Sequence, residues 1–137
     1  MPRVIRLVTV VDARDTESPT EMSVSVRLDA VLDDGRTVTL LDGRGWTAGL
    51  RGPGVTEASD GWSGATAEEI ERMARIVVGP DEPFGGRTQA DMDADHGRAL
   101  ADRLRTAGVE VDPTAVCSLL HEVVLSDALR DRLEPAR

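Results

Sequence analysis

Hydrophobic and polar residues alternate strictly in the first third of the chain. Every second residue from Met22 to Ala30 is apolar, and the residues between them are polar or charged. This period of two predicts a strand with one buried face. Asp34 and Gly35 then make a favoured hairpin turn, so residues 36–41 are expected to return antiparallel.

Two further stretches have the character of strands. Residues 3–11 are rich in β-branched side chains and apolar enough to be covered on most of both faces. Asp42 and Gly43 predict another turn, after which residues 45–50 could add a weak fourth strand. The front of the chain is therefore expected to form a meander.

After residue 65 the apolar residues recur with helical spacing. Thr66 and Glu69 are spaced as in a capping box, in which each side chain satisfies a free backbone N–H of the other. The residues that follow are apolar on one face as far as Gly79 and Pro80. This pair ends a helix because glycine accepts the left-handed cap conformation and proline cannot continue the helix.

Three more helices are predicted towards the end of the chain. Thr88 can cap a second helix, which Gly108 ends. Asp112 precedes a proline at a first helical position, and inward apolar residues continue from there to Val123. Ser126 can cap a last short helix.

These elements predict an α+β fold, with a three- to four-stranded antiparallel meander followed by three to four helices packed on one face. The length of 137 residues suits a single domain over residues 1–137. Within it we expect a strand-rich part at 1–42, a loop rich in glycine and tryptophan at 43–65, and a helical part at 66–137.

The predicted loop at 43–65 is too long for an ordinary connection and contains both tryptophans, Trp46 and Trp62. One interpretation is that both indoles fold back over the open end of a small core. The other is that the loop binds a partner through Trp46, Trp62 and the neighbouring Arg51. Phe84, the chain's only phenylalanine, lies in a second loop rich in proline and glycine, so we add it to these candidate anchors.

Composition narrows the possible chemistry. The chain has no lysine and no tyrosine, which excludes a Schiff-base lysine, a phosphate-binding loop of the GK[ST] type and a phenolic acid. The net charge of −9 disfavours nucleic acid and anionic membranes as partners and suits a basic protein, although it also serves solubility. The reliance on arginine resembles that of small acidic domains from GC-rich bacteria, a likeness of composition only.

Two features of the sequence indicate the cellular compartment of the protein. Its single cysteine excludes an intramolecular disulfide. The first residues do not read as a secretion signal, because Arg6 and Asp12 interrupt their apolar run, and no segment has membrane-spanning length. We therefore expect a cytoplasmic protein without a disulfide, and nothing in the residue inventory calls for a cofactor.

One cluster could hold a metal or act on a ligand. Asp91, Asp93 and Asp95 are spaced like the start of a calcium loop, but His96 stands where that loop needs glycine and the segment reads as helix. Asp91 and Asp95 would share a helical face and could bind a cation with a third ligand, or they could simply stabilise the helix N-terminus. His96 is then a candidate base or ligand, or a histidine bonded to backbone in the core.

A second pair of residues could carry nucleophilic chemistry. His121 lies one helical turn after Cys117, an arrangement in which an imidazole can activate a thiol. On the predicted helix, however, Cys117 adjoins apolar residues, which favours a small buried side chain. We keep His96, Asp95 and His121 as candidate catalytic residues.

Two functions follow from these observations. The first is a non-catalytic protein-binding or regulatory module, such as an inhibitor or immunity protein, that uses Trp46, Trp62 and Phe84 on another protein or on a second copy of itself. The second is a small enzyme or a metal- or ligand-binding domain built on Asp91, Asp95 and His96.

Overall fold

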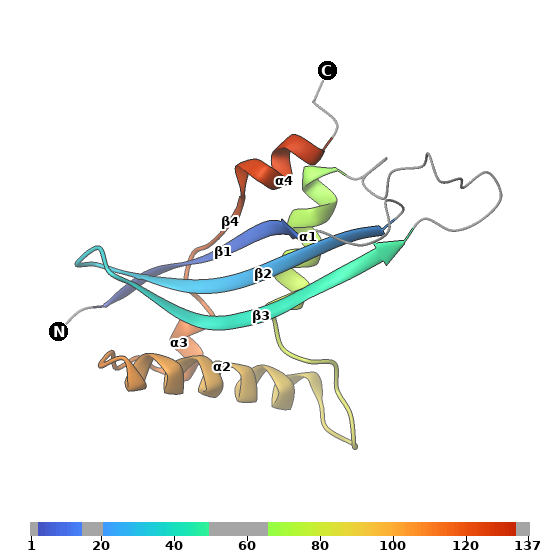
Figure 1. The fold of residues 1–137 in the computed structure, drawn as a ribbon. Coiled ribbons are helices and arrows are strands. Elements are labelled where there is room, and N and C mark those ends of the chain that lie inside the picture. Colours follow the sequence, from blue (N-terminus) through green and yellow to red (C-terminus); the bar gives the residue numbers. More distant parts are fainter. Residues whose placement is uncertain (1–2, 15–20, 50–65, 134–137) are drawn as a thin grey trace.

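The computed structural model describes residues 3–14, 21–49 and 66–133. Within these ranges it has one four-stranded sheet in the order β3-β2-β1-β4 (Figure 1). Its strands are β1 (Val4–Arg14), β2 (Glu21–Leu32), β3 (Thr37–Gly49) and β4 (His121–Leu125). β1 and β3 both pair antiparallel with β2, whereas β4 runs parallel to β1. The sheet is therefore mixed, and the predicted antiparallel meander describes only its first three strands.

The predicted hairpin is confirmed. β2 and β3 are joined by a tight turn in which the Gly35 N–H donates to the Leu32 carbonyl at 3.0 Å. Gly35 has φ +88°, a conformation that residues with a Cβ rarely adopt. In the register that follows, Ala30 lies opposite Val38, which keeps the apolar residues of β2 on one face.

β3 is longer than the sequence suggests. The predicted turn at Asp42 and Gly43 is a bulge, because β3 advances three residues, from 41 to 44, while β2 moves back two, from 28 to 26. Gly43 still takes the positive φ that a turn would need, at +78°. The strand then continues to Gly49, so the first seven residues of the predicted 43–65 loop belong to the sheet.

The four helices of the described residues begin at their predicted caps. They are α1 (Ala67–Val77), α2 (Gln89–Thr106), α3 (Pro113–Val116) and α4 (Asp127–Arg132). Each begins with a side-chain oxygen that accepts a backbone N–H, from Thr66, Thr88, Asp112 and Ser126. α2 ends at Thr106, and Gly108, the glycine predicted to end it, follows with φ +86°. None of the helices in the described residues is long and apolar enough to cross a membrane.

The helix predicted to run from Asp112 to Val123 is wrong beyond Val116. α3 ends at Val116, and residues His121–Leu125 form β4 beside β1. A short run of apolar residues fits both the helical and the strand period, so the pattern alone could not decide. The partner strand decides it, since β4 completes its hydrogen bonds on β1.

The helices cover one face of the sheet. In Figure 1, α2 runs along the strands on one side and α1 crosses behind them. The core joins the apolar face of β2 to side chains from α1, α2 and α4, among them Val26, Leu28, Ile70, Leu104 and Leu129. This packing creates the surfaces from which the candidate site is built.

Candidate functional site

The connection between α1 and α2 carries an exposed aromatic ring on a fixed turn. Phe84 is 62% exposed. The Arg87 N–H donates to the Phe84 carbonyl at 3.0 Å, and both central residues, Gly85 and Gly86, have positive φ, at +58° and +80°. This is the pattern of a type I′ turn, which glycine forms without strain.

Arg87 ties this turn to α2. Its guanidinium lies 5.9 Å from the centre of the Phe84 ring and donates a hydrogen bond to the Asp95 carboxylate. Asp95 also pairs with Arg98, one turn along the helix. The hydrogen bond from Arg87, followed by that from Arg98, holds the pKa of Asp95 below its usual range. Phe84 is thus exposed but held in place.

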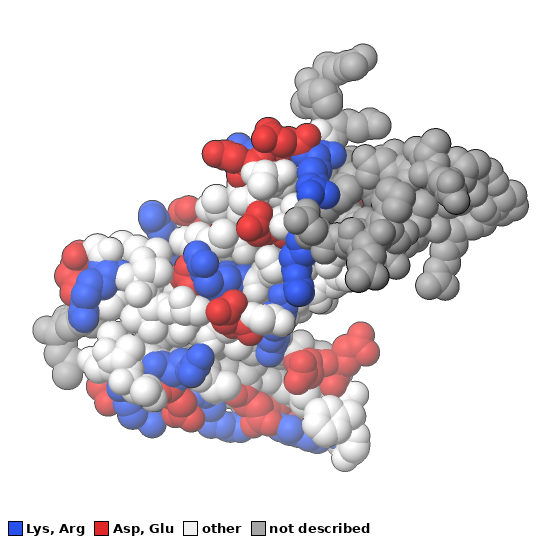
Figure 2. Space-filling view, in the orientation of Figure 1, with Lys and Arg blue, Asp and Glu red and all other residues white. Residues whose placement is uncertain are grey.

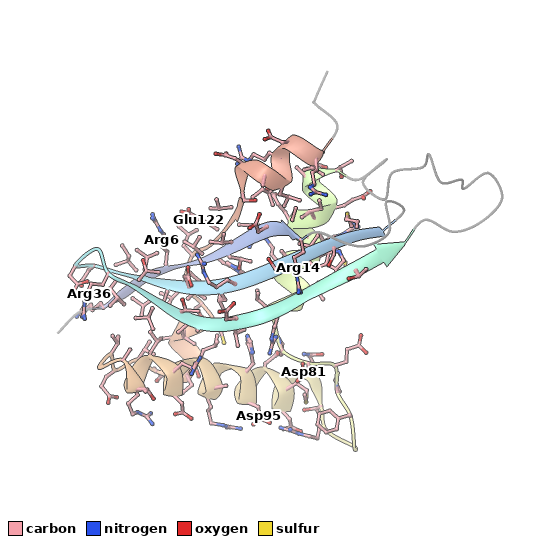
Figure 3. All side chains as sticks on the ribbon, viewed as in Figure 1. Arg6, Arg14, Arg36, Asp81, Asp95 and Glu122 are labelled. Atoms are coloured by element: carbon pink, nitrogen blue, oxygen red, sulfur yellow. The ribbon has the colours of Figure 1, made fainter. Side chains whose placement is uncertain are left out.

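The predicted cluster of Asp91, Asp95 and His96 does not form one site. Asp91 completes the capping box of α2 by accepting the Thr88 backbone N–H, and this bond is the main cause that lowers its pKa. Asp95 lies on the side of α2 that faces away from the sheet (Figure 3). His96 is half-buried and lines a different feature, a cavity beneath the sheet.

The other predicted anchors, Trp46, Trp62 and Arg51, are not placed as exposed side chains in the described structure. Trp46 lies in β3 opposite Val24, is partly buried and packs against the core. Trp62 and Arg51 lie outside the described residues. Of the four candidate anchors, Phe84 is the one that the described structure places as an exposed ring.

A cavity of about 250 Å³ lies between the sheet, the end of α1 and the middle of α2. Its apolar lining includes Leu7, Leu28, Val78, Pro80 and Leu100. Its polar lining is Arg75, Asp93, His96, Cys117 and His121. The chain's two histidines and its one cysteine therefore line a single cavity, although sequence spacing alone linked only Cys117 with His121.

The strand register directs His121 into this cavity. His121 pairs with Leu7 of β1, so its side chain shares the helix-covered face with Leu7 and Thr9. The His121 Nε2 lies 2.5 Å from the hydroxyl of Thr9, which is fully buried. The Arg75 guanidinium donates to the His121 carbonyl at 3.1 Å and links α1 to β4.

Burial of the two histidines and the cysteine of the cavity favours their uncharged forms. Burial is the main cause that lowers the pKa of His96, and Arg44 lowers it further. Burial also lowers the pKa of His121, followed by the effect of Arg75. Burial raises the pKa of the Cys117 thiol. The imidazoles are therefore neutral, and the thiol is not activated as a nucleophile.

The residues that line the cavity do not make a metal centre. Across the part of the chain that the structure describes, no group of three or more histidine, cysteine, aspartate or glutamate side chains is placed to hold a metal ion. Asp93 instead accepts a hydrogen bond from the Gln89 amide at 2.9 Å.

Sequence reasoning missed three residues of the cavity region: Arg75, Asp93 and Thr9. Asp93 precedes His96 by three residues, and Leu100 follows by four, so the helical period could have placed all three on one side. Nothing in the sequence marks Arg75 or Thr9, because their roles depend on β4.

No protein-family model, no curated protein and no solved structure matches this chain. The functional argument therefore depends on the geometry of the Phe84 turn and of the cavity.

Proposed function

We propose that the protein is a non-catalytic binding module that docks on another protein through the turn at Phe84. The observation that carries this proposal is the 62% exposure of an aromatic ring whose backbone and neighbours hold it in place. Large aromatic side chains dominate the binding energy of many protein interfaces. A ring that is already ordered loses little conformational freedom when it binds.

The turn is pre-organised at three levels. The backbone turn is closed by the hydrogen bond from the Arg87 N–H to the Phe84 carbonyl. The Arg87 guanidinium lies over the ring, 5.9 Å from its centre, and it is anchored on α2 through Asp95. An aromatic anchor of this kind fits an apolar socket on the partner.

The charge around the turn favours a basic partner. Asp81 and Glu82 are exposed and lie three and two residues before Phe84 in the connection. Figure 2 shows acidic side chains gathered on the α1–α2 connection beside an uncharged tip. Together with the net charge of −9, they attract a partner whose socket is bordered by arginine or lysine. An inhibitor of a basic enzyme is one form that such a module takes.

The chemistry of the cavity also favours binding over catalysis. The Cys117 thiol is held in its protonated form, and the ring of His121 is engaged with Thr9 and not with the thiol. Outside the cavity, Asp95, a candidate for acid–base chemistry, is paired with Arg87 and Arg98, which keep its carboxylate ionised. These groups lack the activated pair of nucleophile and base that covalent catalysis requires.

The test places a photo-crosslinking phenylalanine analogue at position 84 in the source organism. The protein that crosslinks there is identified, purified and used to measure Kd. We expect Phe84→Ala to weaken binding by at least about tenfold, because an interface anchor contributes roughly 2 kcal/mol or more.

Ile76 supplies a matched control, since it is 63% exposed and lies on α1 outside the turn. Ile76→Ala is expected to bind the same partner within about twofold of wild type, because truncating a side chain that is not a binding anchor changes the affinity little. The proposal fails if Phe84→Ala binds as tightly as Ile76→Ala. It also fails if the protein crosslinked at position 84 is a second copy of this chain.

A further inference from the structure

The cavity beneath the sheet has the size and lining of a small-molecule site. A cavity of roughly 150 Å³ in a protein core is enough to bind benzene. The volume of about 250 Å³ here leaves room for a ring with a substituent. Leu7, Leu28 and Leu100 supply an apolar floor, and polar side chains complete the lining, a combination that is common in ligand pockets.

The charged groups at the rim oppose one another. Arg75 is the cationic residue of the lining and already donates to the His121 carbonyl. Asp93 is its anionic residue and already accepts from Gln89. The partners of both residues are neutral groups, so a ligand with one net charge would be attracted by one of these residues and repelled by the other, and it would also lose its hydration. The lining therefore favours an uncharged molecule.

The two imidazoles can recognise hydrogen-bonding groups. A neutral imidazole has one nitrogen that donates and one that accepts. His121 uses Nε2 towards Thr9, and His96 bonds to the Val78 backbone, so each ring retains its second nitrogen. These second nitrogens can pair with a hydroxyl or amide of the ligand.

A shallow groove of about 570 Å³ adjoins the cavity at Asp93 and Cys117, which line both hollows. It lies between α2 and α3, and its walls are short side chains such as Ala90, Ala94 and Thr114. Asp93 and Cys117 therefore each border both hollows.

We propose that this cavity binds an uncharged, mostly apolar small molecule, the size of a substituted aromatic ring, that hydrogen-bonds to His96 and His121. The proposal goes beyond the docking role of Phe84 and does not depend on it. The site is regulatory or structural in this scheme, because nothing in the lining activates the bound molecule.

The experiment uses the ring signals of the two histidines, the only two in the chain, as reporters in NMR spectra of the full-length protein. Three probes of one shape are titrated at about pH 7.5, where both rings are neutral. They are benzyl alcohol, benzoate and benzylammonium. We expect benzyl alcohol to shift both histidine signals with a saturable, millimolar Kd, and the two ions to bind at least about tenfold more weakly.

Two variants supply the matched comparison. Cys117→Phe places a large ring into the lining, whereas Ala115→Phe adds the same ring at an exposed position that lines neither hollow. We expect the first variant to lose binding of benzyl alcohol and the second to retain it. Intermolecular NOEs from benzyl alcohol to both imidazoles test the site independently, should Cys117→Phe fail to fold.

Three outcomes would overturn the proposal. The first is the absence of a saturable shift with benzyl alcohol. The second is equal or stronger binding of benzoate or benzylammonium, which would mean that the site recognises charge. The third is a folded Cys117→Phe variant that binds as tightly as wild type. None of these results bears on the crosslinking at Phe84, so the two proposals can fail separately.

Discussion

At the scale of single residues, Gly45 sets the strictest limit on the sheet. A Cβ built on Gly45 would overlap the carbonyl oxygen of Val24 on the neighbouring strand. The overlapping atom belongs to the backbone, so it cannot turn aside as a side chain could. Gly43, two residues earlier, differs in kind, because a Cβ there meets no atom within 4 Å but the backbone has φ +78°.

We therefore expect Gly45→Ala to cost more stability than Gly43→Ala. Forcing β2 and β3 apart should lower the free energy of unfolding by about 3 kcal/mol, the upper end for overpacking. The left-handed backbone of an alanine at position 43 should cost about 1 kcal/mol. Urea unfolding of both variants measures the difference, and equal midpoints would show that the strands do not approach as closely as the structure indicates.

Single residues also show how far the sequence leads towards the site. It singled out His96, Cys117 and His121, each for its chemistry, and it singled out Phe84 for its rarity. It could not show that the two histidines and the cysteine line one cavity, because they come from α2, the end of α3 and β4. It also grouped His96 with Asp95, although consecutive residues on a helix point about 100° apart.

At the scale of elements, the helix starts were predictable and one strand was not. A cap depends on residues three positions apart, so Thr66, Thr88 and Ser126 could be recognised from local sequence. β4 depends on β1, a partner more than a hundred positions away in the chain. The register that pairs Leu7 with His121 leaves no local trace, and neither does the parallel direction.

The position of α1 depends on two arginines, one from another element and one of its own. Arg44 of β3 donates to the carbonyls of Val77 at 2.7 Å and Gly79 at 3.2 Å, and so satisfies the end of α1. The predicted left-handed cap at Gly79 is wrong, because Gly79 does not have positive φ. Arg75 of α1 donates a hydrogen bond to the His121 carbonyl and so connects α1 to β4.

These two contacts predict a crossed effect on the histidines. Arg44 lowers the pKa of His96, whereas Arg75 lowers that of His121. Arg44→Met should therefore raise the pKa of His96 and leave His121 unchanged, and Arg75→Met should do the reverse. Following both ring signals by NMR through a pH titration measures this. Both variants moving both histidines equally would point to a general loosening of α1.

Arg44→Met should also destabilise the protein by about 2 kcal/mol, because hydrogen bonds from a charged donor contribute roughly 1.5–3 kcal/mol. Arg75→Met should cost less, since Arg75 is exposed and makes a single bond of this kind. The ratio of the two losses in urea unfolding distinguishes a cap on a helix end from a surface contact.

At the scale of the whole molecule, one connection serves both proposed sites. Val78, Gly79 and Pro80 line the cavity, and the same connection carries Phe84 at its turn a few residues later. The α+β arrangement makes this possible by covering one face of the sheet with α1 and α2 and leaving their link at the edge (Figure 1). The sequence predicted that this link is a loop with an aromatic ring. That the link also lines a cavity could be seen only in the packed structure.

The cavity also makes stability depend on pH. The ordinary histidine pKa of 6.5 applies to the unfolded chain, and burial lowers it for both His96 and His121 in the folded protein. Below about pH 6.5 the unfolded chain therefore binds protons that the folded protein does not. The free energy of unfolding must fall as the pH decreases from neutrality through the folded pKa values. Asp91 and Asp95, whose pKa values are lowered from 3.8, lose their contribution only in stronger acid.

We expect the urea midpoint at about pH 5.5 to lie clearly below that at about pH 7.5. Replacing both rings, as His96→Gln with His121→Gln, should flatten this dependence, because glutamine does not titrate. The comparison of slopes matters more than the absolute stability, which the substitutions also change. A double variant that keeps the wild-type slope would show that other groups take up the protons and that the imidazoles are not held neutral by the cavity.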